Sequence, residues 1–323
     1  MGTIHIFFDS IIALGLLLSA TGAFLLFHLL KKETGYFSSL KKTLSVLLAV
    51  TIAIFLTLAY GSFIEPRIII ERHEQLVLPG IETPFTIALI ADFQTGPYKR
   101  TGFVERVATR LLEDQPDIVL IAGDQIDNSG GTDREISFLE PLRAVAQEIP
   151  TFAVHGNHEY GIVARNPEPT QSSPSKAEKT KSFMETLGIK YPQNELMEIT
   201  IHDQALYIFG SDSWWSGNAD FTPLLNRENL DIPTIVLNHN PAATYEVSQY
   251  GVELLLSGHT HGGQIRLPFL GSIVRSDDSF PESWDKGWYS YNGLTAYTTS
   301  GLGESGTRAR LFNPPEIVYF KIQ

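Results

Sequence analysis

Residues 85–94 read FTIALIADFQ. The run from Phe85 to Ala91 is short and apolar and is bounded by polar residues, which predicts a buried β-strand. The strand ends at Asp92, and Gln94 follows two positions later. A carboxylate delivered by a buried strand to a loop is a common start of a metal or phosphate site, so matching groups are expected in other loops.

Four more short apolar runs have the same form: DIVLIAG (117–123), TFAVHG (151–156), PTIVLNH (233–239) and VELLLSG (252–258). Helical stretches separate the early runs. They read TGFVERVATRLLEDQ (101–115) and REISFLEPLRAVAQEI (134–149), and Pro141 is expected to kink the second one. The order strand, helix, strand predicts an α/β core, whose ligands sit at the carboxyl ends of the strands.

Each of the five predicted strands is followed by polar side chains: Asp92 and Gln94, then Asp124 and Asp127, then Asn157, His158 and Glu159, then His239, and finally His259 and His261. Alone, Asp124 could cap a helix, Asn157 could form a turn and His239 could be a core histidine. Together they supply nitrogen and oxygen donors without sulfur, which suit Mn²⁺, Fe, Zn²⁺ or Mg²⁺. They are too many for one ion and fit two ions bridged by one aspartate.

The ordered blocks Asp-x-Gln, Gly-Asp-x-x-Asp, Gly-Asn-His-Glu, Asn-His and Gly-His-Thr-His resemble the calcineurin-like metallophosphoesterase superfamily, from about residue 85 to the C-terminus. The ending GLGESGTRARLFNPPEI (301–317) is similar to a bacterial branch of phosphohydrolases, several of them membrane-anchored, that includes enzymes cleaving UDP-2,3-diacylglucosamine. The resemblance implies a metallophosphoesterase-type β-sandwich flanked by helices. It also implies a phosphoester or pyrophosphate hydrolase that uses two divalent ions, with Mn²⁺ favoured, and a hydroxide held between them.

The resemblance assigns a role to each polar residue. Asp92 and His261 would hold the first ion, and Asp124 would bridge the two. The second ion would be held by Asn157, His239 and His259. His158 would contact the leaving oxygen as acid or charge stabiliser, and Asp127 would orient this loop or His158.

Gln94 departs from the family pattern, which usually has a histidine at this position. Its Oε1 could bind the first ion as a weaker donor than imidazole, or Gln94 could hold a metal-bound water. The third reading is an empty first site in a catalytically weak, membrane-tethered binding protein. Arg308 and Arg310 are the candidate substrate-binding residues, with surface ion pairs as the alternative.

The first 65 residues are far more apolar than the rest. The segments 11–27 and 43–63 are each long enough to cross a bilayer, which predicts transmembrane helices at about 8–30 and 43–63. The alternative is a signal peptide followed by a core helix. The predicted organisation is an anchor over 1–65, a linker over 66–84 and a catalytic domain over 85–323.

The connecting loop holds four lysines, at positions 31, 32, 41 and 42, against Arg67 and Arg72 after the second helix. The resemblance implies a multi-pass protein of the bacterial inner membrane. The positive-inside rule favours a catalytic domain outside the cytoplasm. UDP-2,3-diacylglucosamine is cytoplasmic, so the two expectations point to different sides. An exoplasmic phosphomonoesterase is the corresponding alternative.

The net charge of −12 over 323 residues argues against nucleic acid as a partner. The expected partners are the membrane and a phosphorylated, lipid-linked substrate, and a monomer is the default. The stretch 161–180 is expected to be a surface loop, and the runs at 294–300 and 316–322 a closing strand pair. Trp214 and Trp215 could line an apolar channel, rest at the lipid interface or pack in the core.

Overall fold

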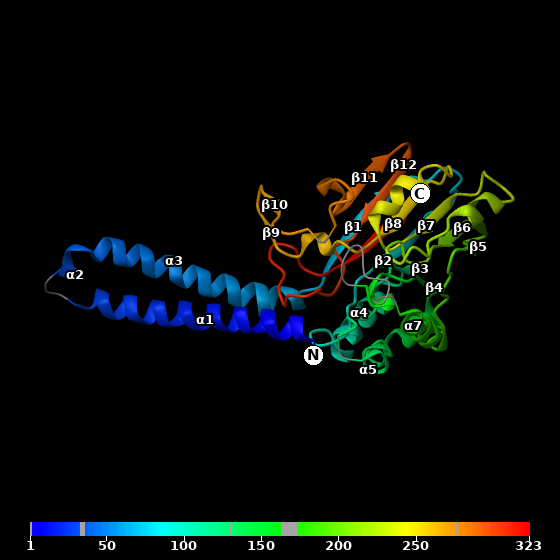
Figure 1. Cartoon of the computed structure of the whole chain (residues 1–323). Helices are drawn as coiled ribbons and strands as arrows, with labels where there is room; N and C mark the ends of the chain where they lie inside the picture. Colours follow the sequence, from blue (N-terminus) through cyan, green and yellow to red (C-terminus); the bar gives the residue numbers. More distant parts are fainter. Residues whose placement is uncertain (1, 33–35, 130, 163–172, 276) are drawn as a thin grey trace.

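The structure is a computed structural model and describes residues 2–32, 36–129, 131–162, 173–275 and 277–323. Two long N-terminal helices form a hairpin that projects from a body of sheets and shorter helices (Figure 1). The prediction of a mixed α/β body preceded by two apolar helices is confirmed.

The first sheet has five strands in the order β1-β13-β2-β3-β4. Their bounds are Ile70–Leu76 (β1), Glu316–Ile322 (β13), Phe85–Ile90 (β2), Ile118–Ile121 (β3) and Thr151–Ala153 (β4). Neighbours are parallel except for β13 and β2. The inner strand β3, between β2 and β4, is buried on both faces, which explains why it reads as an unbroken apolar run.

The second sheet has six strands in the order β11-β12-β8-β7-β6-β5. Their bounds are Gly287–Tyr291 (β11), Leu294–Thr298 (β12), Leu254–Ser257 (β8), Thr234–Leu237 (β7), Gln204–Gly210 (β6) and Glu195–Ile201 (β5). The four inner strands are parallel, and β11 and β5 run antiparallel at the edges. A separate small hairpin consists of β9 (Arg266–Leu267) and β10 (Gly271–Ser272).

The main hydrophobic cluster draws residues from both sheets. Ile87 and Leu120 come from the first sheet and Leu237 and Leu256 from the second, and all four are fully buried. A further cluster packs the first sheet against α4 (Thr101–Asp114), α6 (Leu142–Glu148) and α7 (Pro174–Thr186). The strands are thereby fixed between apolar layers, and this packing holds the loops that follow them.

The helical predictions are confirmed with one exception. The stretch 134–149 divides into α5 (Thr132–Ser137) and α6, and the break lies at Pro141. The loop prediction for 161–180 falls partly on 163–172, which lie outside the described residues. From Pro174 onward it is wrong, because α7 begins there with proline in its first turn and buries Ala177 and Met184.

The N-terminal hairpin consists of α1 (Thr3–Leu30) and α3 (Lys41–Ala59), joined by a region that contains the short helix α2 (Tyr36–Ser39). A π-helical turn, η1 (Tyr60–Ile64), and a 3-10 turn, η2 (Glu65–Arg67), continue α3 into the body. Thr3–Leu30 and Lys41–Arg67 are long and apolar enough to cross a membrane. Most of their surface is exposed, so neither is a core helix of the body.

Two expectations about chain organisation are corrected. The stretch 66–84, expected as a linker, contains β1, which pairs with β13 in the first sheet. The runs expected as a closing strand pair belong to different sheets, since β12 pairs with β8 and β11. β13 cannot pair with β12, because β1 and β2 already occupy both of its edges.

Candidate metal centre

The candidate ligands lie in loops that follow the carboxyl ends of β2, β3, β4, β7 and β8. Asp92, Asp124 and His259 adopt positive φ angles of 54°, 52° and 73°, so the chain turns sharply where each strand ends. Gly258 makes this close approach possible: a Cβ atom at this position would lie 2.7 Å from Oδ2 of Asp92. The two sheets thus bring five separate loops to one place.

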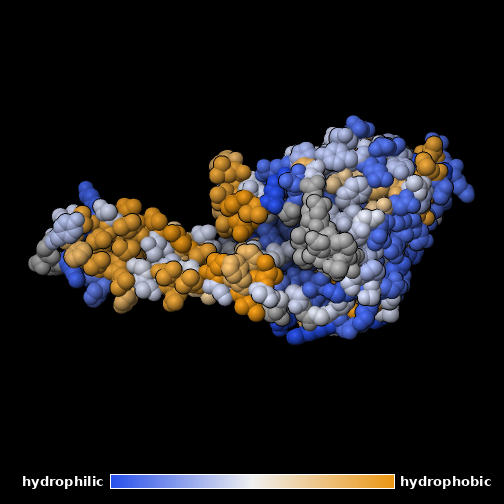
Figure 2. Space-filling model, in the orientation of Figure 1, coloured by the Kyte–Doolittle hydropathy of each residue, from blue (hydrophilic) through white to orange (hydrophobic). Residues whose placement is uncertain are grey.

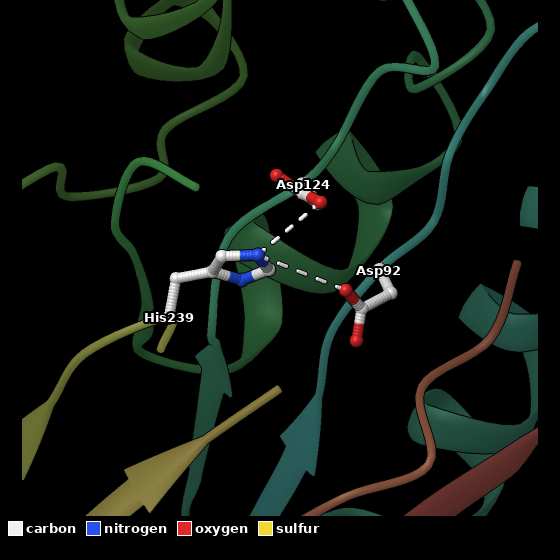
Figure 3. A group of neighbouring side chains, drawn as sticks. All are labelled: Asp92, Asp124 and His239. Atoms are coloured by element: carbon white, nitrogen blue, oxygen red, sulfur yellow. Dashed lines mark ion pairs between the residues drawn. The ribbon is translucent and has the colours of Figure 1, made fainter. Parts of the chain in front are cut away.

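Asp92, Asp124 and His239 form the centre of the site (Figure 3). Nε2 of His239 lies 3.2 Å from Oδ2 of Asp124 and 3.9 Å from Oδ1 of Asp92. The opposite ring nitrogen, Nδ1, lies 2.7 Å from the carbonyl oxygen of Ala122. Because a carbonyl only accepts, Nδ1 carries a hydrogen, and Nε2 is directed between the two carboxylates.

Asn157 and His259 meet beside this centre. Oδ1 of Asn157 lies 3.0 Å from Nδ1 of His259, while Nδ2 of Asn157 donates to the carbonyl oxygen of Ile162 at 2.6 Å. The backbone N–H of His259 donates to both carboxylate oxygens of Asp92 at 3.1 Å. The amide oxygen of Asn157 and the ring nitrogen of His259 therefore lie close enough to be two ligands of one ion.

His261 also approaches Asp92. Its Nε2 lies 3.7 Å from Oδ1 of Asp92, and its Nδ1 lies 3.2 Å from the carbonyl oxygen of Gly303. The structure therefore brings together the residues that sequence reasoning assigned to the first ion.

Gln94 is buried and contacts the central carboxylate. Its Nε2 donates to Oδ2 of Asp124 at 2.8 Å. Its Oε1 is buried and has no hydrogen-bond partner among the residues that the structure describes. A buried amide oxygen without a partner is costly in a folded protein and is the atom that would bind a hard cation.

His158 and Asp127 extend the site on the other side of Asp124. The backbone N–H of His158 donates to Oδ1 of Asp124 at 2.9 Å, and its Nε2 lies 3.9 Å from Oδ2. Nδ1 of His158 lies 2.9 Å from the carbonyl oxygen of Asp127. Asp127 thus contacts the His158 ring through its backbone carbonyl.

Glu159 has a structural task that its motif alone did not reveal. It is fully buried, and its carboxylate accepts hydrogen bonds from four backbone N–H groups, those of Asp124, Gln125, Ile126 and Gly156. It therefore ties the loop after β3 to the loop after β4. A carboxylate held by several backbone donors fixes loop geometry strongly.

Burial and charge shift the pKa values of the central groups in opposite directions. Burial raises the pKa of Asp92 to about 7. Burial alone would lower the pKa of His239, but the Asp124 and Asp92 carboxylates raise it to about 9. Burial would raise the pKa of Asp124, yet His239 and His158 hold it far below its usual range. The centre is thus a buried place where carboxylates attract positive charge.

This arrangement fits divalent ions. Carboxylate, amide and imidazole donors converge in a buried site, and one amide oxygen is left without a partner among the described residues. These donors are those that Mn²⁺, Fe²⁺ and Zn²⁺ use in proteins. The residues that would hold the ions are Asp92, Gln94, Asp124, Asn157, His239, His259 and His261.

The two candidate substrate arginines do not reach this centre in the way expected. Arg310 is fully buried, and its guanidinium donates to the carbonyl oxygens of Ser300, Gly303 and Asn313 at 2.6–3.1 Å. The surface ion-pair interpretation of Arg310 is wrong, because the residue is fully buried, while its role in substrate binding stays a prediction. Arg308 lies 3.5 Å from Asp9 and stacks 4.5 Å from the ring centre of Tyr98.

Several residues near the site could not have been found from local sequence. Oδ2 of Asp277 lies 3.6 Å from Nε2 of His259 and accepts from Nε1 of Trp215 at 3.1 Å. Trp215 in turn packs edge-on against the His259 ring at 4.5 Å. His5, on α1, lies beside Asp127. Among the residues that the structure describes, no buried strand precedes Asp277 or His5, so no strand-end pattern indicated them.

Comparison with known proteins identifies the family. A family model described as calcineurin-like phosphoesterase matches residues 85–263. The uncharacterized metallophosphoesterase YkuE of Bacillus subtilis is 27% identical over 269 residues, covering 82% of this chain and 89% of that protein. A Helicobacter pylori metallophosphoesterase is 29% identical over 268 residues, covering 81% of this chain and 65% of that protein.

Phosphodiesterase YaeI of Escherichia coli is 28% identical over 280 residues, covering 85% of this chain and 96% of that protein. The region that the family model matches contains every candidate metal ligand, and it spans more than half of the chain. The chain belongs to the calcineurin-like phosphoesterase family.

Proposed function

We propose that the protein is a membrane-anchored phosphoesterase that uses two divalent metal ions to hydrolyse a phosphoester or pyrophosphate bond. The observation that carries the proposal is the meeting of Asp92, Asp124 and His239 in a buried centre at the strand ends. Of the bond types in question, the printed name of the relative YaeI, a phosphodiesterase, favours a phosphodiester.

The ligand sets divide around Asp124. Asp92, Gln94 and His261 would hold the first ion, and Asp124 would be shared. Asn157, His239 and His259 would hold the second. Bound divalent ions would neutralise charge on the phosphoryl oxygens and supply a strong nucleophile at neutral pH, with Mn²⁺ favoured.

His158 is the group best placed to manage the leaving oxygen. Its Nδ1 faces a backbone carbonyl that can only accept, so Nδ1 carries a hydrogen. Nε2 is then the ring atom that takes up or releases a proton, on the side of Asp124. Asp127 positions the ring, and the Glu159 carboxylate holds the loop from which His158 projects.

The N-terminal hairpin supports anchoring in a bacterial inner membrane, with two spans, over residues 1–65. Its exposed apolar surface and length suit a bilayer. Figure 1 shows that the C-terminal end of α1 and the start of α3 lie far from the body. Lys31 and Lys32 follow α1, and Lys41 and Lys42 begin α3. This lysine distribution favours a catalytic domain outside the cytoplasm. The substrate class that suits a tethered site is a phosphate or pyrophosphate carried by a lipid, of which UDP-2,3-diacylglucosamine is the cytoplasmic example.

The test uses the full chain in detergent with bis-p-nitrophenyl phosphate and Mn²⁺. Hydrolysis by the wild type is expected, together with its loss in Asp124→Asn. Asp203→Asn is the matched control, because Asp203 is exposed and its φ of 63° is similar to the 52° of Asp124. Hydrolysis that survives in Asp124→Asn would contradict the metal site. Absence of hydrolysis with Mn²⁺, Fe²⁺, Zn²⁺ and Mg²⁺ would favour a binding protein.

The side of the membrane separates the remaining substrate classes. Protease added to sealed cells should cut the catalytic domain if it faces outward, as the lysines predict. Protection of the domain in sealed cells, with cutting after lysis, would instead admit cytoplasmic nucleotide-linked lipids. An outward-facing domain that prefers phosphomonoesters would support the exoplasmic phosphomonoesterase alternative.

A further inference from the structure

The most exposed apolar side chains of the body lie on the small β9–β10 hairpin. Phe269 is completely exposed, and Leu270 and Val274 are 75% and 73% exposed. We call residues 264–274 the β9–β10 finger. Figure 2 shows its apolar surface projecting beside the apolar surface of the N-terminal hairpin. A soluble surface rarely presents several large apolar side chains together, which marks a contact site.

Hydrogen bonds connect the finger to the membrane-anchor end of the body. Arg266 and Gln264 exchange backbone hydrogen bonds with Leu311 at 2.9 and 3.0 Å. Arg310, which precedes Leu311, donates its backbone N–H to the carbonyl oxygen of Gly61 in η1 at 2.8 Å. The finger, the strand-like segment at 310–311 and the end of α3 therefore form one continuous region.

Apolar exposure continues across this region. Phe312, beside Leu311, is 60% exposed, and Ile64 at the end of η1 is 52% exposed. The surface that begins on the two long helices thus extends over the end of α3 to the finger. Lipid is the one partner that would cover all of it at once, because the helices and the finger would share the same bilayer.

The finger tip holds a bulky apolar residue in an unfavourable backbone conformation. Phe269 has φ of 68°, a conformation that favours glycine or asparagine and costs energy for an aromatic residue. Neither packing nor a hydrogen bond requires its ring, since the ring is fully exposed. A large apolar side chain kept in a strained turn and in water is expected when the turn enters an apolar medium.

The finger grows directly from the metal-binding loop. His261 lies in η6 (His261–Gly263), and Gln264 follows it at the base of the finger. The guanidinium of Arg266 donates to the carbonyl oxygen of Gly262 at 2.8 Å, and Oε1 of Gln264 accepts from the N–H of Ser305. A finger held in the lipid would therefore hold the candidate metal centre next to the membrane surface.

We propose that the β9–β10 finger inserts Phe269 and Leu270 into the leaflet next to the body, so that the site takes phosphate groups presented at the lipid surface. This inference rests on the proposed function, because it requires α1 and α3 to cross the same bilayer. It names the surface through which a lipid-borne substrate would be recognised.

The insertion can be measured with one probe at a time, because the chain has no cysteine. The full chain in lipid nanodiscs carries bimane on Phe269→Cys, Leu17→Cys or Leu230→Cys. Leu17 tests the hairpin, and Leu230 is an apolar control on the body that is 70% exposed. Lipids with a nitroxide on the acyl chain should quench the probes at 17 and 269 and leave the probe at 230 bright.

The outcomes distinguish insertion of the finger from insertion of the N-terminal hairpin. Quenching at 17 without quenching at 269 would overturn the finger and leave the anchor standing. Absence of quenching at 17 would overturn both. If the probe at 269 is not quenched, and the unlabelled Phe269→Cys chain forms a disulfide between the 269 positions of two copies, the partner is a second copy of the chain.

An activity measurement provides the second test. The double variant Phe269→Ser/Leu270→Ser should lose about tenfold in kcat/KM on diacylglycerol p-nitrophenyl phosphate in phosphatidylcholine vesicles, since two large apolar contacts are lost. Its hydrolysis of soluble bis-p-nitrophenyl phosphate should not change, and Leu225→Ser/Leu230→Ser should behave as wild type on both. Equal loss on both substrates would contradict a lipid contact. A wild type inactive on both would refute the proposed function, while the quenching experiment would still test the finger.

Discussion

Nε2 of His5, near the start of α1, lies 3.2 Å from Oδ2 of Asp127, and both side chains are buried. The carbonyl oxygen of Asp127 in turn contacts Nδ1 of His158. One residue of the N-terminal hairpin therefore reaches the candidate active site through a chain of two contacts. The N-terminal hairpin therefore contributes a side chain to the surroundings of the candidate site.

The contact predicts that His5→Ala lowers kcat about tenfold with little change in KM, because His5 positions Asp127 and through it His158. Steady-state kinetics on bis-p-nitrophenyl phosphate measures kcat and KM separately. His28→Ala is the control, since His28 is exposed near the other end of the same helix. Equal kinetics of the two variants would show that His5 does not act on the site.

Gln94 predicts a measurable weakness of the first metal site. Gln94→His should tighten Mn²⁺ binding about tenfold, because imidazole is a stronger donor than an amide oxygen. The hydrogen bond from residue 94 to Asp124 is lost or rearranged in this variant. Titration of the metal-free chain with Mn²⁺ by calorimetry gives the dissociation constants. Gln115→His is the matched control, because Gln115 is exposed and its φ of 46° is similar to the 48° of Gln94. Unchanged Mn²⁺ affinity in Gln94→His would place residue 94 outside the coordination shell.

Glu159 predicts a stability effect in addition to an effect on activity. Glu159→Gln replaces a charged acceptor of four N–H groups by a neutral amide, which should cost about 2 kcal/mol of unfolding free energy. For a body of this size the melting temperature should fall by roughly 4–8 °C. Thermal unfolding followed by circular dichroism measures the shift. The exposed Glu195→Gln should melt as the wild type, and an equal melting temperature for Glu159→Gln would refute the role.

The two arginines near the C-terminus should behave differently from each other. Arg310→Ala removes the buried hydrogen bonds to the carbonyl groups of Ser300, Gly303 and Asn313 and is expected to lower the melting temperature by more than the Glu159 variant. Arg308→Ala removes a partly exposed ion pair and should change the melting temperature little. A stable Arg310→Ala protein with a raised KM would instead support the substrate-binding interpretation.

The positions of the candidate ligands could be predicted from sequence because each one follows a buried apolar strand. The pattern at Asp92 and at Asp124 is local, so a short window contains both the strand and its polar end. The sheet that holds β13 could not be predicted in the same way, since its partners β1 and β2 lie far from it in sequence. His5 and Arg310 were missed or misassigned because their partners come from distant loops and helices.

The central claim is that two ions share the carboxylate of Asp124. Anomalous diffraction from crystals of the full chain soaked with Mn²⁺ tests it most directly. The account predicts two manganese peaks about 3.5–4 Å apart, with Asp124 between them, Asp92 and His261 on one ion and Asn157, His239 and His259 on the other. A single peak, or two peaks that Asp124 does not join, would contradict it.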